Sequence, residues 1–242
     1  MDYSDIYRGR SKIYPCSPFV SDIGFTLLMR LCYNEKRKVP LGEITQYIEN
    51  HQEEINMKNN VDWTALMIVC RNGDSEDSYE IIKLLLDYGA NPNLQDNYGH
   101  NALMKCIHGY RDFNIKTIKL LLEYGTDINA QDKDGWTALM MSVFHQLGHT
   151  NSAIIDLLLE YNADTKLKTK SNMTALKIAY LANSRWYGKS IIKTLRKKKL
   201  KKIQLHNRKL KERNKILKQH LEEYPEGMYI VELFHSINYL KD

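Results

Sequence analysis

The sequence has few of the residues that build disulfide frameworks, metal centres or membrane spans. It contains four cysteines in 242 residues, and no two of them form a Cys-x-x-Cys pair. No long apolar run is present and the mean hydropathy is −0.50, which excludes a transmembrane helix. Residues Met1–Asp5 also lack the basic start and apolar core of a signal peptide, so we expect an intracellular protein that does not enter a membrane.

Catalytic motifs are lacking as well. The sequence has no glycine-rich phosphate loop, no His-Glu-x-x-His and no serine or cysteine in a nucleophile motif. The one metal-like pairing is His145 and His149, and it has no third ligand nearby in the sequence. We therefore predict that the protein is not an enzyme and uses no metal or cofactor.

What the sequence does contain is a repeated block. Four copies start 37, 36 and 37 residues apart, and a fainter copy precedes them. Three of the cysteines recur five or six residues after the start of a block, which favours packing over disulfides. A fixed period of this length indicates stacked helical repeats. The copies are Thr64–Met67, Asn101–Met104, Thr137–Met140 and Thr174–Lys177, with the fainter one at Thr26–Met29.

Each unit predicts two helices joined by a polar loop. The first residue of the block can cap a short apolar helix, and a Leu-rich second helix follows the loop. Gly89, Gly125 and Asn162 stand where the second helix would need a left-handed residue at its end. One unit cannot bury its own apolar face, so the units must pack on one another.

These features resemble the ankyrin repeat family over roughly residues 25–195. Thr-Ala-Leu-Met stands for the family's Thr-Pro-Leu-His, and the run from Ile81 to Asn93 matches its second helix and turn. The resemblance implies an all-α ankyrin solenoid of helix-turn-helix units with β-turn tips. The family period is about 33 residues, so the extra ones fall at 72–79, 109–114 and 145–152. Methionine at the family's histidine position predicts apolar packing in place of polar ties between units.

The resemblance divides the chain into consecutive segments. We expect a degenerate repeat, three full repeats and a partial one, followed by a basic helix and a short tail helix. The segments are 1–24 (N-terminal segment), 25–60 (degenerate repeat), 61–97, 98–133 and 134–170 (full repeats), 171–195 (partial repeat), 196–224 (basic helix) and 225–242 (tail helix).

The basic helix has three interpretations. Residues 196–220 hold twelve Lys or Arg and one Glu, and apolar residues alternate at spacings of three and four over 200–221, with Asn207 and Asn214 on the seam. The helix could cap the stack, form a homodimeric coiled coil, or bind nucleic acid, an acidic partner or the nuclear import machinery. The last interpretation would place the protein in the nucleus rather than the cytoplasm. Its basic patch is Arg196, Lys197, Lys198, Lys199, Lys201 and Lys202.

The resemblance also implies a protein-binding surface on the turn tips and the ends of the first helices. Trp and Tyr dominate interface hot spots, although an aromatic before the block can instead pack on the next turn. The alternatives are binding through the basic helix, with the repeats as scaffold, and an adaptor that recruits host factors. The composition and the repeat block together resemble the large ankyrin families of giant amoeba-infecting viruses. The candidate contact residues are Trp63, Tyr98, His100, Lys133, Trp136, Met173, Arg71 and Phe144.

Overall fold

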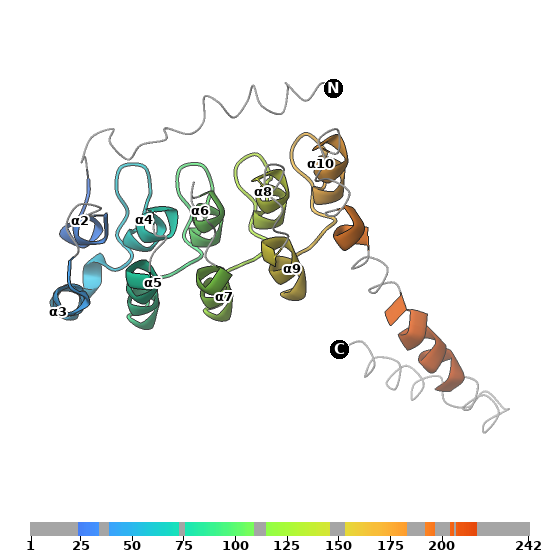
Figure 1. The fold of residues 1–242 in the computed structure, drawn as a ribbon, viewed down its shortest axis with the longest axis horizontal. Helices are drawn as coiled ribbons and strands as arrows, with labels where there is room; N and C mark the ends of the chain where they lie inside the picture. The colour runs from blue at the N-terminus through green and yellow to red at the C-terminus, as the bar shows by residue number, and fades with distance from the viewer. Residues whose placement is uncertain are drawn as a thin grey trace, which may run out of the picture. The chain divides into compact units, whose positions relative to one another are not determined.

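The computed structural model describes residues 24–33, 39–72, 76–108, 115–145, 153–182, 192–196, 204–205 and 207–216 (Figure 1). The chain divides into two units, residues 1–192 and 193–242, and each is treated by itself. The described residues contain helices and turns but no β-strand, which confirms the predicted all-α class.

The first unit is a series of helix pairs. The first helices of the pairs are α2 (Leu27–Tyr33), α4 (Ala65–Asn72), α6 (Ala102–His108), α8 (Ala138–His145) and α10 (Ala175–Ala182). The second helices are α3 (Leu41–Asn50), α5 (Glu76–Asp87), α7 (Ile115–Glu123) and α9 (Ala153–Glu160), and a short 3-10 turn, Gln52–Glu54, follows α3.

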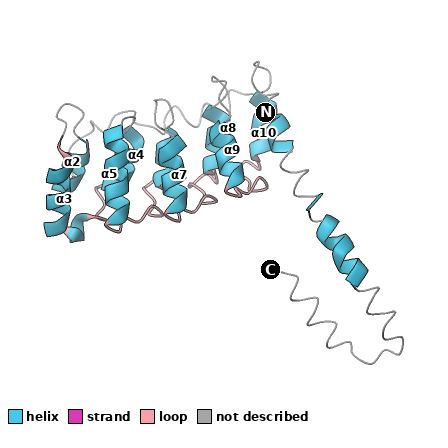
Figure 2. Ribbon diagram, turned by 60° about the horizontal axis from the view of Figure 1, so that its bottom comes forward, coloured by secondary structure: helices cyan, strands magenta, loops and turns pink. Residues whose placement is uncertain are grey.

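The helices form two layers. Each first helix contacts the next first helix along the chain, and α3, α5, α7 and α9 contact one another in the same order. Figure 1 shows the first helices as one row and the second helices as another. In the turned view of Figure 2, the loops that lead from each pair to the next follow one edge of the array. This arrangement is the predicted solenoid, in which each pair packs only on its neighbours.

The predicted cap starts each first helix. The backbone N–H of Met67 donates to Thr64 Oγ1 at 3.3 Å, and that of Met104 donates to Asn101 Oδ1 at 3.0 Å. The same bond forms in the other units, including the faint N-terminal copy, where the Met29 N–H donates to Thr26 Oγ1 at 3.2 Å. A side-chain acceptor at this position satisfies a backbone donor that the helix leaves open.

The predicted left-handed residues end the second helices. Gly89 has φ +86°, Gly125 has φ +76° and Asn162 has φ +65°. Backbone N–H groups of the following residues return to the last turn; the Ala90 N–H, for example, donates to the Leu85 carbonyl at 2.8 Å. These caps reverse the chain toward the next first helix.

The core runs along the facing sides of the first helices. Met67, Met104 and Met140 are each 1% exposed, so the residues that replace the family's histidine are buried between units. Cys70 and Cys106 are buried beside them, as their regular placement predicts, and burial raises the pKa of Cys106 to about 12. A thiol in that environment packs as a small apolar group and is a poor nucleophile.

Two expectations need correction. The first concerns the extra residues at 72–79: Glu76–Tyr79 form the first turn of α5, so they lengthen the second helix. Residues 73–75, 109–114 and 146–152, which make up most of the extra residues, lie outside the described part of the chain.

The second correction concerns ties between units, which were expected to be apolar only. Asn56 Oδ1 accepts the Asn91 N–H at 2.7 Å, Asn93 Oδ1 accepts the Asp127 N–H at 2.6 Å, and Asn129 Oδ1 accepts the Asp164 N–H at 2.8 Å. A parallel row uses glutamine: Gln95 Nε2 donates to the Gln131 carbonyl at 3.1 Å, and Gln131 Nε2 donates to the Lys168 carbonyl at 3.0 Å. Polar ties therefore exist, but they lie in the turns and not at the methionine position.

In the second unit, residues 193–196, 204–205 and 207–216 are helical, and the side chains of the last stretch are exposed or half-buried. The rest of the predicted basic helix, 196–224, and the whole tail helix, 225–242, lie outside the described residues. One continuous helix and the homodimeric coiled coil over 200–221 therefore remain predictions.

Candidate partner-binding surface

The turn tips are shaped by one side chain at the start of each turn. Asp96 Oδ1 accepts the N–H groups of Tyr98 and His100 at 2.9 and 2.8 Å, and Asp132 Oδ1 does the same in the next tip. Asn59 takes this role in the tip before, where its Oδ1 accepts the Trp63 N–H at 2.8 Å. Asp and Asn favour such turns because their short side chains reach the backbone two residues on.

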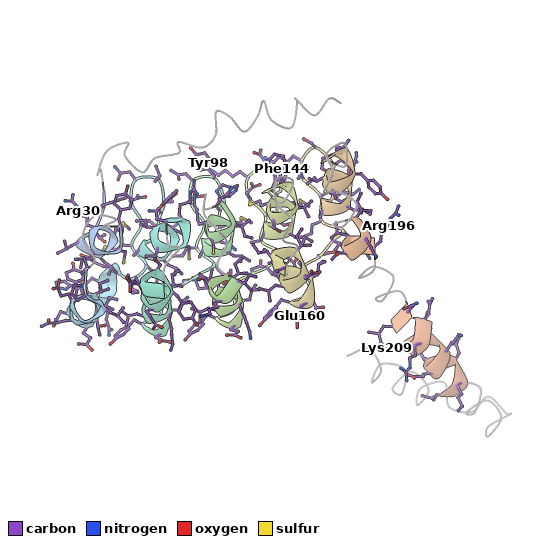
Figure 3. The ribbon with its side chains drawn as sticks, in the orientation of Figure 1. Arg30, Tyr98, Phe144, Glu160, Arg196 and Lys209 are labelled. Atoms are coloured by element: carbon purple, nitrogen blue, oxygen red, sulfur yellow. The ribbon has the colours of Figure 1, made fainter. Side chains whose placement is uncertain are left out.

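Neighbouring tips are joined through their backbones. The Asn97 N–H donates to the Val61 carbonyl at 3.3 Å, the Lys133 N–H to the Tyr98 carbonyl at 2.9 Å, and the Lys170 N–H to the Asp134 carbonyl at 2.9 Å. The tips of four successive units thus form one hydrogen-bonded ribbon beside the first helices. Figure 3 labels Tyr98 and Phe144 along this side of the array and Glu160 in the opposite layer.

Trp63 lies between two units. Its indole Nε1 donates to Asp96 Oδ2 at 3.1 Å, and the ammonium of Lys105 lies 3.9 Å from the centroid of its ring. Trp63 is half-buried, so much of its ring packs on the next turn. The indole N–H of Trp63 already has an acceptor, so a binding partner could contact only the apolar edge of the ring.

A buried charged cluster supports these tips. Lys105 Nζ forms an ion pair with Asp96, and both side chains are at most 5% exposed. Desolvation lowers the pKa of Lys105 to about 8, while the nearby Asp96 carboxylate acts in the opposite direction. His100 lies between two carboxylates, with Nδ1 3.9 Å from Asp96 and Nε2 3.5 Å from Asp132. The cluster fixes two successive tips relative to each other.

Three predicted contact residues present aromatic surface. Tyr98, Trp136 and Phe144 are each half-buried. The ring of Trp136 meets that of Phe144 edge to face with centroids 5.7 Å apart, and the ring of Tyr98 stacks on His100 at 6.0 Å. Each ring is therefore held by contacts within the array and keeps part of its surface exposed, as a preformed anchor requires.

Two predicted contact residues are wrong. His100 is 2% exposed and Met173 is 6% exposed, so a partner could not touch either. Both stand just before the residue that caps a first helix, the position that the half-buried Trp63 and Trp136 occupy in the other units. The signal that could have found this was the register within the tip, because Tyr98 lies two residues before His100 and is half-buried where His100 is buried.

The charged residues among the predicted contacts differ in how exposed their side chains are. Lys133 is exposed in its tip, whereas Arg71 is half-buried and its guanidinium donates to the His108 carbonyl of the next unit. Arg196 of the basic patch is exposed, and Lys197, Lys198, Lys199, Lys201 and Lys202 lie outside the described residues.

Within the described residues, no group of three or more His, Cys, Asp or Glu side chains could hold a metal ion. The side chains of His145 and His149 lie outside that part of the chain. No helix among the described residues is both long enough and apolar enough to cross a membrane.

Comparison with known proteins agrees with the architecture. The family model for ankyrin repeats in three copies matches residues 28–132 and 110–205. The chain belongs to the ankyrin repeat family. Three proteins of Acanthamoeba polyphaga mimivirus named as ankyrin repeat proteins are similar to it. They are 37% identical over 92 residues, 39% over 80 residues and 34% over 99 residues.

These alignments are partial on both sides. They cover 36%, 33% and 39% of this chain and only 14%, 13% and 18% of the relatives. The chain therefore spans less than a fifth of the length of the viral ankyrin proteins that it matches. The likeness to giant-virus ankyrin families that the sequence predicts is confirmed at the level of the repeats.

Proposed function

We propose that the chain is a non-enzymatic protein-interaction module that binds its partner through the turn tips and the ends of the first helices. One observation carries the proposal: the tips are hydrogen-bonded into a ribbon, and Tyr98 and Trp136 in the tips and Phe144 near the end of α8 are half-exposed. Ankyrin repeats in general serve as protein-binding modules, and the family membership supports the same role here.

The geometry explains how such a surface would bind. A few aromatic anchors supply most of the energy of a protein interface, and losing one costs about 2 kcal/mol or more. Because the backbone ribbon and the cluster around Asp96 hold the tips in place, little conformational entropy is lost on binding. The exposed side chain of Lys133 would belong to the polar rim of this surface, and the edge of the Trp63 ring would lie at its margin.

A comparison of two surface pairs tests the proposal. Tyr98→Ala/Phe144→Ala removes two anchors from the tip and first-helix side. Tyr124→Ala/Tyr161→Ala removes two aromatics that follow the second helices, and serves as the matched control. Each chain would be used as bait in an amoebal lysate, at low salt and at about 0.5 M salt, where surface charge attraction is screened.

We expect a partner that the wild type and the control retain at both salt concentrations and that the anchor variant loses by tenfold or more. Circular dichroism would establish that both variants keep the wild-type helix content. An anchor variant that folds normally and keeps every partner would overturn the proposal. Retention at high salt also separates this surface from binding through charge alone, and localisation of the chain in infected cells would test the expected intracellular site.

A further inference from the structure

The segment that leads from α9 to α10, and α10 itself, carry exposed lysines. Lys166, Lys168 and Lys170 are exposed, while Leu167 between them is half-buried and Thr169 is 6% exposed. Three exposed lysines thus fall within five residues of one another in this connecting segment. Lys177, on α10, is exposed as well.

Two of these lysines stand in the rows that tie each unit to the next. Lys166 stands 37 residues after Asn129, in the row of asparagines that accept a backbone N–H from the following unit. Lys168 stands 37 residues after Gln131, in the row where Lys58, Gln95 and Gln131 each donate to a backbone carbonyl of the following unit. An ammonium group donates hydrogen bonds but cannot accept one, so Lys166 cannot continue the asparagine row.

Lys177 replaces a methionine that packs between neighbouring first helices in the other units. Lys177 stands where Met67, Met104 and Met140 are buried between neighbouring first helices. Tyr180, one helical turn further along the same face, is 43% exposed, while Val143 at the same position in α8 is fully buried. A further repeat of the same kind would have to bury an unpaired ammonium here, so the sequence disfavours such a repeat on this face of α10.

These lysines belong to a strongly basic stretch of the sequence. Between residues 165 and 220 the sequence holds nineteen Lys or Arg and one acidic residue, Glu212. The basic region thus begins inside the repeat array, thirty residues before the basic run that follows it. Within the described residues, none of Lys166, Lys168, Lys170 and Lys177 forms an ion pair, unlike Lys58, Lys105 and Lys119 in the earlier units.

We propose that this lysine edge, defined as Lys166, Lys168, Lys170 and Lys177, binds the phosphate backbone of nucleic acid without reading its sequence. Lysine contacts phosphate as a point charge, whereas it is depleted at protein–protein interfaces, where arginine is enriched. All four cations of the edge are lysines, so the edge lacks the planar, bidentate donors that recognise carboxylates or base edges. The exposed ring of Tyr180 beside Lys177 offers a surface on which an unpaired base could stack.

The test measures binding of the full chain to fluorescein-labelled 20-nucleotide DNA and RNA, single- and double-stranded, by anisotropy over a range of salt concentrations. The test variant is Lys166→Gln/Lys168→Gln/Lys170→Gln/Lys177→Gln. The matched control, Lys58→Gln/Lys83→Gln/Lys116→Gln/Lys119→Gln, removes the same charge from exposed lysines of earlier units. A third chain, Arg208→Gln/Lys209→Gln/Lys211→Gln/Lys215→Gln, removes the same charge from the second unit.

We expect the test variant to bind at least tenfold more weakly than the matched control. The slope of log affinity against log salt should also fall by about 3, since each lost phosphate contact removes 0.7 to 0.9 from it. Equal affinity and slope in the test variant and the matched control would overturn the proposal. So would loss of binding in the third chain alone, which would place the contact in the second unit.

A competition experiment separates nucleic acid from an acidic protein. If polyglutamate binds the wild type and labelled nucleic acid does not, the lysine edge serves an acidic polypeptide and the proposal is wrong. The anchor variant, Tyr98→Ala/Phe144→Ala, should bind nucleic acid as the wild type does, so the failure of either proposal can be recognised without the other.

Discussion

At the residue scale, the buried pair of Asp96 and Lys105 is asymmetric. Asp96 accepts four hydrogen bonds, two of them from backbone N–H groups, and Lys105 has Asp96 as its partner and lies over Trp63. Asp96→Ala leaves an ammonium buried without its counter-charge, and we expect it to lower the free energy of unfolding by about 3 to 5 kcal/mol. Lys105→Met removes the ammonium and leaves Asp96 three hydrogen-bond donors, so it should cost less than Asp96→Ala does. Urea denaturation of both variants measures the difference, and equal losses would contradict it.

The same lysine gives a dependence on pH. Desolvation lowers the folded-state pKa of Lys105 from 10.5 to about 8. Between these values the unfolded state binds more protons than the folded state, so the free energy of unfolding should rise with pH by at most about 3 kcal/mol. The rise should appear as a difference from Lys105→Met, which serves as the control for every other group that titrates in this range. Stability curves of the two chains that stay parallel from pH 7.5 to about 10 would contradict this assignment.

At the element scale, two glycines with the same left-handed conformation have different surroundings. Gly125 ends a second helix with φ +76°, and a Cβ added there would meet nothing within 4 Å. Gly99 sits in a tip with φ +83°, and its Cβ would lie 2.8 Å from the Lys133 nitrogen of the next tip. We expect Gly125→Ala to cost about 1 to 2 kcal/mol, the cost of a left-handed alanine, and Gly99→Ala to cost clearly more. Thermal denaturation of the two variants measures which substitution costs more. Equal losses of stability would contradict the prediction and would mean that neighbouring tips can move apart at little cost.

The elements also show how far the sequence could predict the fold. The helix caps at Thr64 and Gly89 were predictable because their partners lie within a few residues in the chain. The asparagine and glutamine rows were not, because each bond joins residues about 36 apart, and a single turn containing Asn93 resembles any polar turn. The signal was the recurrence of Asn at 56, 93 and 129 and its end at Lys166. Likewise, burial of His100 and Met173 depends on the neighbouring tip, which a motif within one unit does not describe.

At the scale of the whole molecule, stability in the repeat array should fall from the centre toward both ends. A residue in a solenoid is stabilised by its own unit and the adjacent ones, and an end unit has one neighbour in place of two. All seven residues of α6 are buried, whereas α2 buries Leu28 and Met29 and exposes Leu27. In native-state hydrogen exchange, we therefore expect the amides of α6 to be protected most and those of α2 and α10 least, because the end helices can open without the rest. Uniform protection from α2 to α10 would instead mean that these helices unfold as one unit. The ties through Asn56, Asn93 and Asn129 would then couple the ends to the centre more strongly than contacts between adjacent units predict.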